Sequence, residues 1–307
     1  MIPLAHVGSG TLEPLQLVPV LVAVFAYWAR AATLARHGKP VAVGRQVSFA
    51  SGLILIVAGL VSPVAHLGEE LFLAHMGQHL VIGDIAPILI AIGLTGPLLA
   101  PILRNPVVAR LKTLAHPGIA FPLWLANLYF WHLPFAYQGA LNSPLVHAVE
   151  HGAFIGFGIL MWMPVFGPLP TPSWFGLVSK LIYVVGVRFG GALLANALMW
   201  SGTALYPDYA PGVALWDISL LADQGTAGVI MLIEGSLVTL GVIAWVFLQA
   251  ADQAEKSQDL IDEAERLGVE LDPARAKRAV AAGRGAELRE RILSGAGLPG
   301  SGRGTPA

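Results

Sequence analysis

The sequence contains no cysteine, and only 12% of its 307 residues are charged. Without cysteine the chain cannot form a disulfide, a thiolate metal site or a thiol redox centre. Any metal ion would have to bind to histidine, methionine, carboxylate or backbone groups. The low charge is equally restrictive, because soluble domains average roughly 25% charged residues. With 55% hydrophobic residues and a mean hydropathy of +0.68, the composition indicates a polytopic membrane protein.

The apolar runs do not alternate with polar residues as the strands of a β-barrel do, and they contain no internal repeat or phosphate-binding glycine motif. They are continuous, and windows of about 20 residues predict an all-α bundle of transmembrane helices. Seven such helices are expected. Their approximate limits are residues 15–34, 47–66, 71–93, 118–137, 145–166, 177–200 and 225–249.

The positions of lysine and arginine predict how this bundle is oriented. Four basic residues flank the first connection, three lie in the third, Lys180 begins the sixth helix, and nine occupy the C-terminal tail. Arg188 lies within a helix, and the N-terminal segment and the other connections have none. The positive-inside rule therefore places the N-terminus outside and the C-terminus in the cytoplasm. A count of six or eight helices would put a basic segment outside.

A change in composition near residue 250 predicts two parts. Residues 1–250 form the seven-helix transmembrane domain, and residues 251–307 form a charged cytoplasmic tail that is partly helical or disordered. The pattern around residues 259–267 predicts a short amphipathic helix. Asp272 and Pro273 are suited to be the N-cap and the first residue of another.

Histidine is concentrated at the helix ends that this topology assigns to the outer side. His75 and His79 are four residues apart at the start of the third helix, so both project from one face. A second pair with the same spacing starts the fifth helix, with Glu150 beside it. Two more histidines stand alone, and a lone interfacial histidine is commonly a hydrated side chain. The six are His66, His75, His79, His132, His147 and His151. Imidazoles from different helices at one depth indicate a metal site.

Methionine helps to choose between metals. Met76, Met199 and Met231 fall toward the outer ends of their helices. Imidazole combined with thioether suits copper, especially Cu(I), whereas zinc favours histidine with carboxylate and water. The sequence therefore favours copper, with zinc as the alternative.

A second polar set lies at mid-membrane depth and comprises Asp84, Arg188 and Glu234. An arginine at this depth needs a counter-ion, and either acid could provide it. A structural ion pair is the favoured interpretation. A proton or ion path beneath the histidines is the alternative.

Several motifs, in order and spacing, resemble the caa3-type cytochrome c oxidase assembly factors of the CtaG kind. They are His75-Met76-Gly77-Gln78-His79-Leu80 followed by Ala86-Pro87 and Gly96-Pro97, Trp131-His132-Leu133-Pro134, His147-Ala148-Val149-Glu150-His151, Leu205-Tyr206-Pro207, and Asp223-Gln224-Gly225-Thr226-Ala227-Gly228-Val229-Ile230-Met231. The resemblance covers roughly residues 45 to 249. Leu232 departs from it, since tryptophan is expected there.

The resemblance implies a seven-helix protein of the bacterial plasma membrane that helps a haem-copper oxidase to mature, by handling copper on the outer side. It implies oxidase subunits and membrane lipid as partners, with no role for nucleic acid. It carries the suspected ligands to His75, Met76, His79, His132, His147 and His151, and also to Asp223 and Met231. The expected action is metal binding and transfer, not enzymatic turnover.

Three other functions remain open from the sequence. A seven-helix zinc hydrolase acting on a lipid amide would use three histidines and a carboxylate, with Glu150 as general base. A b-type cytochrome would need opposed histidines across a haem, which pairs on one helix fit poorly. A cation permease would use Asp84, Arg188 and Glu234.

Overall fold

The computed structural model describes residues 14–61, 63–106, 110, 112–281 and 283–294, and within these ranges its regular elements are all helical. The chain divides into two compact units, one ending at Leu240 and the other starting at Gly241. In the first unit the N-terminal half contains α1 (Pro14–Arg36), α2 (Val43–Val61), α3 (Pro63–Glu70), α4 (Phe72–Leu80), the π-helical turn η2 (Val81–Ile85), α5 (Ala86–Gly93) and α6 (Gly96–Leu103).

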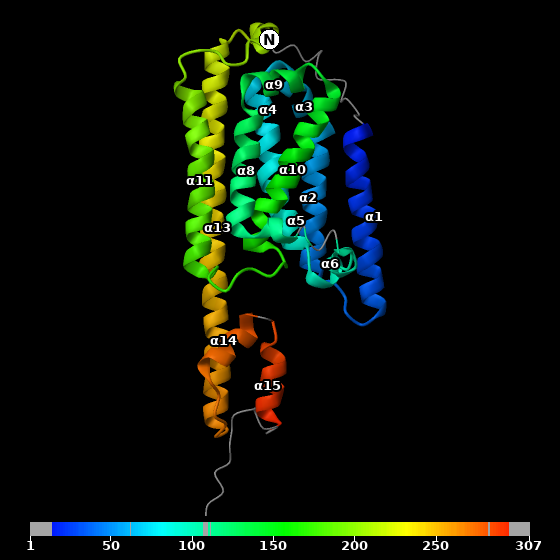
Figure 1. The fold of residues 1–307 in the computed structure, drawn as a ribbon, viewed down its shortest axis with the longest axis vertical. Coiled ribbons are helices and arrows are strands. Elements are labelled where there is room, and N and C mark those ends of the chain that lie inside the picture. The colour runs from blue at the N-terminus through cyan, green and yellow to red at the C-terminus, as the bar shows by residue number, and fades with distance from the viewer. Residues whose placement is uncertain (1–13, 62, 107–109, 111, 282, 295–307) are drawn as a thin grey trace, which may run out of the picture. The chain divides into compact units, whose positions relative to one another are not determined.

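The remaining elements follow in chain order (Figure 1). They are η3 (Lys112–Ala115), α8 (Pro117–Trp131), α9 (Pro134–Leu141), α10 (Pro144–Phe166), α11 (Leu177–Trp200), η4 (Pro207–Tyr209), α12 (Ala210–Leu215), α13 (Leu220–Arg266), α14 (Pro273–Ala281) and α15 (Gly285–Leu293). Helix α13 begins in the first unit and ends in the second.

Six helices of the described residues are long and apolar enough to cross a membrane. They are α1, α2, the continuous segment Phe72–Gly93, α10, α11 and α13. Each corresponds to one of the seven expected helices, and α11 has the expected limits of residues 177–200. The all-helical membrane architecture is therefore confirmed.

The fourth expected helix, residues 118–137, differs from the prediction. The structure divides it into α8, which has only 15 residues, and α9, with a break at His132 and Leu133. Leu133 has an extended backbone (ψ 133°) because Pro134 disfavours the helical conformation in the residue before it. A window of apolar residues does not detect such a break, because proline counts little against hydropathy.

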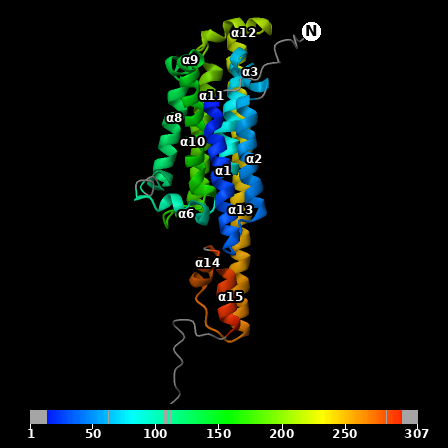
Figure 2. The same cartoon turned by 90° about the vertical axis from the view of Figure 1, so that its right-hand side faces the viewer.

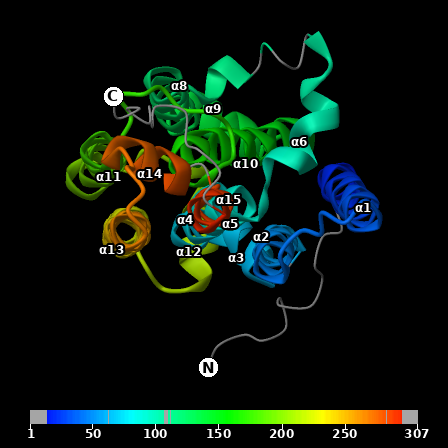
Figure 3. The ribbon, with the colours of Figure 1, turned by 90° about the horizontal axis from the view of Figure 1, so that it is seen from below.

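The α4–α5 segment and α10 form the centre of the first unit. Seen along the bundle axis, α10 lies between α8 and α5, and α5 lies between α10 and α2 (Figure 3). The π-helical turn η2 also packs against α10. At their contact, a methyl group on Gly158 would lie 2.1 Å from the Gly83 carbonyl oxygen, so only glycine permits this approach.

The short helices lie at the two ends of the first unit. Helices α3, α9 and α12 share one end, whereas α6 lies at the other (Figure 2). Helix α4 follows α3 directly and α10 follows α9. The first turns of α4 and α10, which carry the two histidine pairs, are therefore at the end that α3, α9 and α12 cover.

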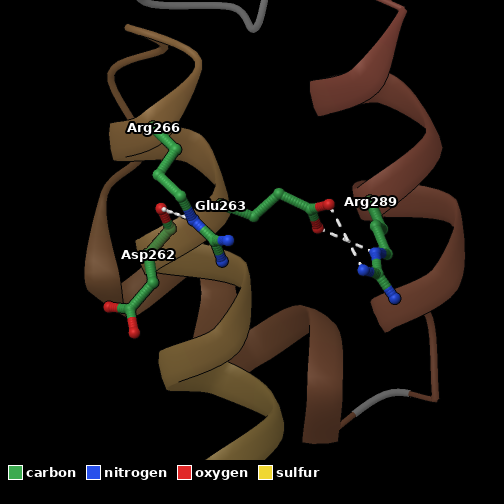
Figure 4. Close-up of polar contacts among 4 residues, drawn as sticks. All are labelled: Asp262, Glu263, Arg266 and Arg289. Carbon is green, nitrogen blue, oxygen red and sulfur yellow. Dashed lines mark hydrogen bonds and ion pairs between the residues drawn. The ribbon is translucent and has the colours of Figure 1, made fainter.

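The second unit is a small helical bundle with its own apolar core. Residues from the last part of α13 pack against α14 and α15, and the core consists of Leu260, Ala264, Ala276, Leu288 and Ile292. Glu263 of α13 accepts two hydrogen bonds from Arg289 of α15, at 2.7 and 3.2 Å (Figure 4). Asp272 accepts from the backbone N–H of Ala274 at 2.9 Å, as expected for the N-cap of α14.

Candidate metal centre

Four histidines and one glutamate converge in the interior of the first unit. The ring centroids of His75 and His79 are 4.3 Å apart, and those of His147 and His151 are 4.2 Å apart. The two pairs also face each other across α4 and α10, with 5.2 Å between His75 and His147 and 5.2 Å between His79 and His151. We call these four residues and Glu150 the histidine cluster.

Two overlapping sets of ligand atoms lie within the histidine cluster. The atoms of His75, His79 and His151 are all within 4.8 Å of one another, and so are those of His75, His147 and Glu150. Two nitrogens bound to one ion can be at most about 4.2 Å apart, because metal–nitrogen bonds are about 2.1 Å long. Side-chain shifts of less than about 1 Å would therefore allow either set to hold an ion.

Tyr209 fixes the orientation and tautomer of His75. Its hydroxyl donates to the Gly68 carbonyl at 3.1 Å and lies 3.1 Å from His75 Nδ1 and 2.8 Å from the Tyr137 hydroxyl. Burial raises the pKa of the Tyr209 phenol, so it keeps its proton. In the arrangement in which this proton goes to Gly68, His75 Nδ1 donates to Tyr209. The lone pair of His75 is then on Nε2, which faces His79 Nε2 at 2.9 Å.

His151 is oriented in the same way from another helix. Its Nδ1 contacts Gln16 Oε1 of α1 at 2.8 Å, which leaves Nε2 to bind an ion. Nε2 of His151, Nε2 of His147, Nδ1 of His79 and both carboxylate oxygens of Glu150 are buried without a hydrogen-bond partner in the structure. A buried carboxylate and several imidazoles without partners are costly unless they bind an ion.

A polar opening connects the histidine cluster with the exterior of the first unit. Its wall includes His75, His147, Glu69, Asn142 and Asp208, which come from α3, α4, α9, α10 and η4. Glu69 is exposed, and two carboxylates at such an opening would attract cations. An ion can therefore reach the cluster from this end of the bundle.

Met76, His132 and Met231 lie on the wall of a different cavity of about 80 Å³. His132 Nδ1 contacts the Leu128 carbonyl at 2.7 Å, and His132 Nε2 faces Met76 Sδ at 3.3 Å. His132 does not belong to the ligand sets above. His79 lines the cavity as well, so it lies between the cavity and the rest of the histidine cluster.

Two of the expected ligands lie elsewhere. His66 faces Glu69 on its own helix at 3.5 Å and is in neither ligand set. Both oxygens of Asp223 accept backbone N–H groups, from Phe72 at 2.8 Å and from Leu73 at 3.0 Å, and so cap the start of α4. Asp223 thus supports the helix that carries His75 and His79.

The mid-membrane polar set is not paired as expected. Arg188 donates to the Leu232 carbonyl at 3.0 Å and to Ser236 Oγ at 2.8 Å, and within the described residues it makes no ion pair with either acid. Asp84 instead accepts from Trp162 Nε1 and is hydrogen-bonded to Glu234. The predicted ion pair is therefore wrong, since the guanidinium donates to a backbone carbonyl and a hydroxyl, and Asp84 accepts from Trp162.

Sequence reasoning did not identify Tyr209 or Gln16 as part of the site. Tyr209 is 134 residues from His75 along the chain, and Gln16 is 135 residues from His151. Both are single polar residues without a motif of their own. Only their contacts with histidine reveal their role.

Comparison with known protein families agrees with this architecture. The model of the cytochrome c oxidase caa3 assembly factor family matches residues 25–253, which include all of the histidine cluster and the cavity. No curated protein and no solved structure matched the chain. The match covers well over half of the chain, and the protein therefore belongs to the caa3 cytochrome c oxidase assembly factor family.

Proposed function

We propose that this protein binds copper at the histidine cluster and passes it to an apo-subunit of a haem-copper cytochrome c oxidase. The observation that carries the proposal is the convergence of five ligand side chains from α4 and α10, four of them buried and His147 half-buried, with ligand atoms within 4.8 Å in each of two sets. The assembly role is inferred from membership of the family. The histidine cluster would contribute to this role by binding the metal.

Copper is the metal that best suits the whole set of donors. Imidazole binds both copper and zinc, but the cavity next to the cluster also presents two buried thioethers, Met76 and Met231. Thioether sulfur favours Cu(I) and contributes little to zinc sites. Glu150 in the cluster is the donor that would also tolerate zinc.

Transfer to a partner needs ligands that exchange and an open approach. The opening at His75 and His147 provides the approach, since it reaches two cluster histidines directly. An oxidase subunit with its own copper ligands would dock at this end and remove the ion by ligand exchange. The protein acts here as a carrier, with membrane lipid around it and no substrate turned over.

The same proposal places the protein in a bacterial plasma membrane with the opening on the outer side. Helix α8, although only 15 residues long, then serves as the seventh membrane-crossing element. With seven crossings, every lysine-rich or arginine-rich segment lies in the cytoplasm, as the positive-inside rule requires. The alternative of a lipid-amide zinc hydrolase gains no support from the structure or the family.

Replacement of His75 and His147 by glutamine tests the assembly role. In cells that need this protein for the oxidase, the double variant should lower the copper content and activity of the oxidase at least about tenfold, since it removes a donor from both ligand sets. His37→Gln is the matched control, because His37 is exposed and its side chain is hydrogen-bonded to the Thr33 carbonyl of α1, far along the chain from the cluster. Unchanged oxidase copper in the double variant, with normal protein levels, would refute the role.

A further inference from the structure

The cavity beside the histidine cluster contains a donor pair, Met76 and His132, whose contact a neutral imidazole cannot satisfy as a hydrogen bond. The Leu128 carbonyl can only accept, so His132 must carry its proton on Nδ1 to make the 2.7 Å contact. His132 Nε2 then has a lone pair, and it faces the lone pairs of Met76 Sδ at 3.3 Å. The two lone pairs repel each other, whereas a cation between the two atoms would accept both of them.

The pair is held in place from both sides. Met76 is 1% exposed and His132 is 6% exposed, so neither side chain can turn toward solvent. The Tyr206 hydroxyl donates to the His132 carbonyl at 2.8 Å, which fixes the break between α8 and α9 where His132 lies. The separation of 3.3 Å is suitable for two donors on one ion, because metal–nitrogen and metal–sulfur bonds are about 2.1 and 2.3 Å long.

A single ion cannot use this pair and the histidine cluster together. His132 is in neither set of ligand atoms within 4.8 Å. The buried ring of Phe154 also lies close to both groups, 4.3 Å from the His79 ring and 6.2 Å from the His132 ring. Apart from His79, the two sets of donors are therefore separate in space.

His79 is the residue that the two sets share. Met76, His79 and Gly83 recur at helical spacing along α4 and η2 and line the cavity, whereas His75 lies on the adjoining face. His79 Nε2 faces His75, and its Nδ1 is buried without a partner. The imidazole can thus offer Nε2 to an ion in the histidine cluster in one tautomer and Nδ1 to an ion in the cavity in the other, with its single proton on the opposite ring nitrogen each time.

We propose that Met76 and His132 form a second, thioether-containing metal site, which accepts Cu(I) from the histidine cluster by way of His79. This inference rests on the proposed copper function and makes it more specific. The ion keeps its oxidation state and only exchanges ligands. The cavity of about 80 Å³ exceeds the roughly 10–15 Å³ that one water-sized particle needs, so it has room for the ion. Met231 on the same wall is a further donor within the cavity.

The chemistry of the two sites predicts different selectivity. The histidine cluster, with imidazole and carboxylate, accepts either Cu(I) or Zn(II), whereas the thioether site accepts only the softer ion. A zinc ion that enters through the polar opening would stop at the cluster. The second site would therefore act as a selection step before delivery.

The test is anaerobic titration of the purified full-length chain with Cu(I) and, separately, with Zn(II). The wild-type protein should bind about two Cu(I) but only about one Zn(II), and X-ray absorption of the Cu(I) form should show sulfur as a ligand. Met76→Leu, which conserves volume, should weaken the sulfur signal and lose about one Cu(I) while it keeps zinc binding. Met161→Leu is the matched control, because Met161 is 0% exposed and does not line the cavity.

Two results would overturn the second site. One is a wild-type protein that binds Cu(I) through nitrogen and oxygen alone, and the other is a Met76→Leu protein with unchanged sulfur signal and stoichiometry. His132→Gln gives an independent check, since it removes the nitrogen of the pair. In the His75→Gln/His147→Gln variant the sulfur signal should persist at high Cu(I), because Met76 and His132 are intact. This last measurement separates failure of the second site from failure of the oxidase role, which is measured in cells.

Discussion

Individual residues around the histidine cluster determine which nitrogen faces the ion. Tyr209 orients His75, Gln16 orients His151, and the Leu128 carbonyl orients His132. In each case Nδ1 is occupied by a hydrogen bond, so Nε2 is the atom left for a metal. Such outer partners set the tautomer and position of a metal ligand, so their loss typically lowers metal affinity by about 10–100-fold.

Tyr209→Phe should therefore weaken metal binding without abolishing it. The variant loses the hydroxyl that contacts His75, Gly68 and Tyr137 but keeps the ring that packs against Phe72. We expect copper affinity to fall about 10–100-fold with unchanged stoichiometry. A competition titration against a chelator of known affinity measures this. Unchanged affinity would show that His75 does not need this partner.

Asp223→Ala separates a capping role from a ligand role. The carboxylate accepts the first two N–H groups of α4, so its loss should destabilise the protein by about 1 kcal/mol. The melting temperature in detergent should fall while copper stoichiometry stays the same. A variant that melts normally but has lost copper would show that Asp223 is a ligand, as the family motif implied.

At the level of helices, close packing places the two histidine pairs face to face. Helix α10 approaches η2 at Gly158 and Gly83, and the π-helical turn adds one residue just beyond His79. π-helical turns within α-helices are frequent at functional sites. The spacing of the pairs along each helix was visible in the sequence. Their convergence was not, because it depends on this contact between distant glycines.

Gly158→Ala should consequently disturb the site through packing alone. Its new methyl group would collide with the Gly83 carbonyl, which costs about 1–3 kcal/mol in a well-packed interior. We expect a lower melting temperature in detergent and weaker copper binding. Gly156→Ala is the matched control, since a methyl group there meets no atom within 4 Å. Equal behaviour of the two variants would contradict the packing argument.

Hydropathy predicted the limits of a helix well where the helix ends together with its apolar residues. Helices α10 and α11 start and end within one residue of expectation, whereas α13 continues to Arg266, well beyond the apolar residues. A helix can continue through charged residues when they have high helix propensity and form side-chain pairs four residues apart, and the residues after 250 meet both conditions. The break at Pro134 and the partners of Arg188 depended on local geometry and on tertiary contacts, which hydropathy does not report.

For the whole molecule, the proposed copper function requires the opening to the histidine cluster to face the compartment from which copper arrives. The natural absence of cysteine makes the orientation directly measurable. Asp208→Cys, at the opening, should react with a membrane-impermeant thiol reagent in intact cells. Lys39→Cys and Lys256→Cys should react only after the membrane is permeabilised. The reverse pattern would place the opening in the cytoplasm.

The copper content of the purified protein tests the central claim most directly. Protein isolated from membranes supplied with copper should contain the metal, and the His75→Gln/His147→Gln variant should contain about one ion less per chain, since both ligand sets use His75. The His37→Gln control should match the wild type. Wild-type protein without copper, or a double variant with as much copper as the wild type, would contradict the assignment of the histidine cluster as a copper site.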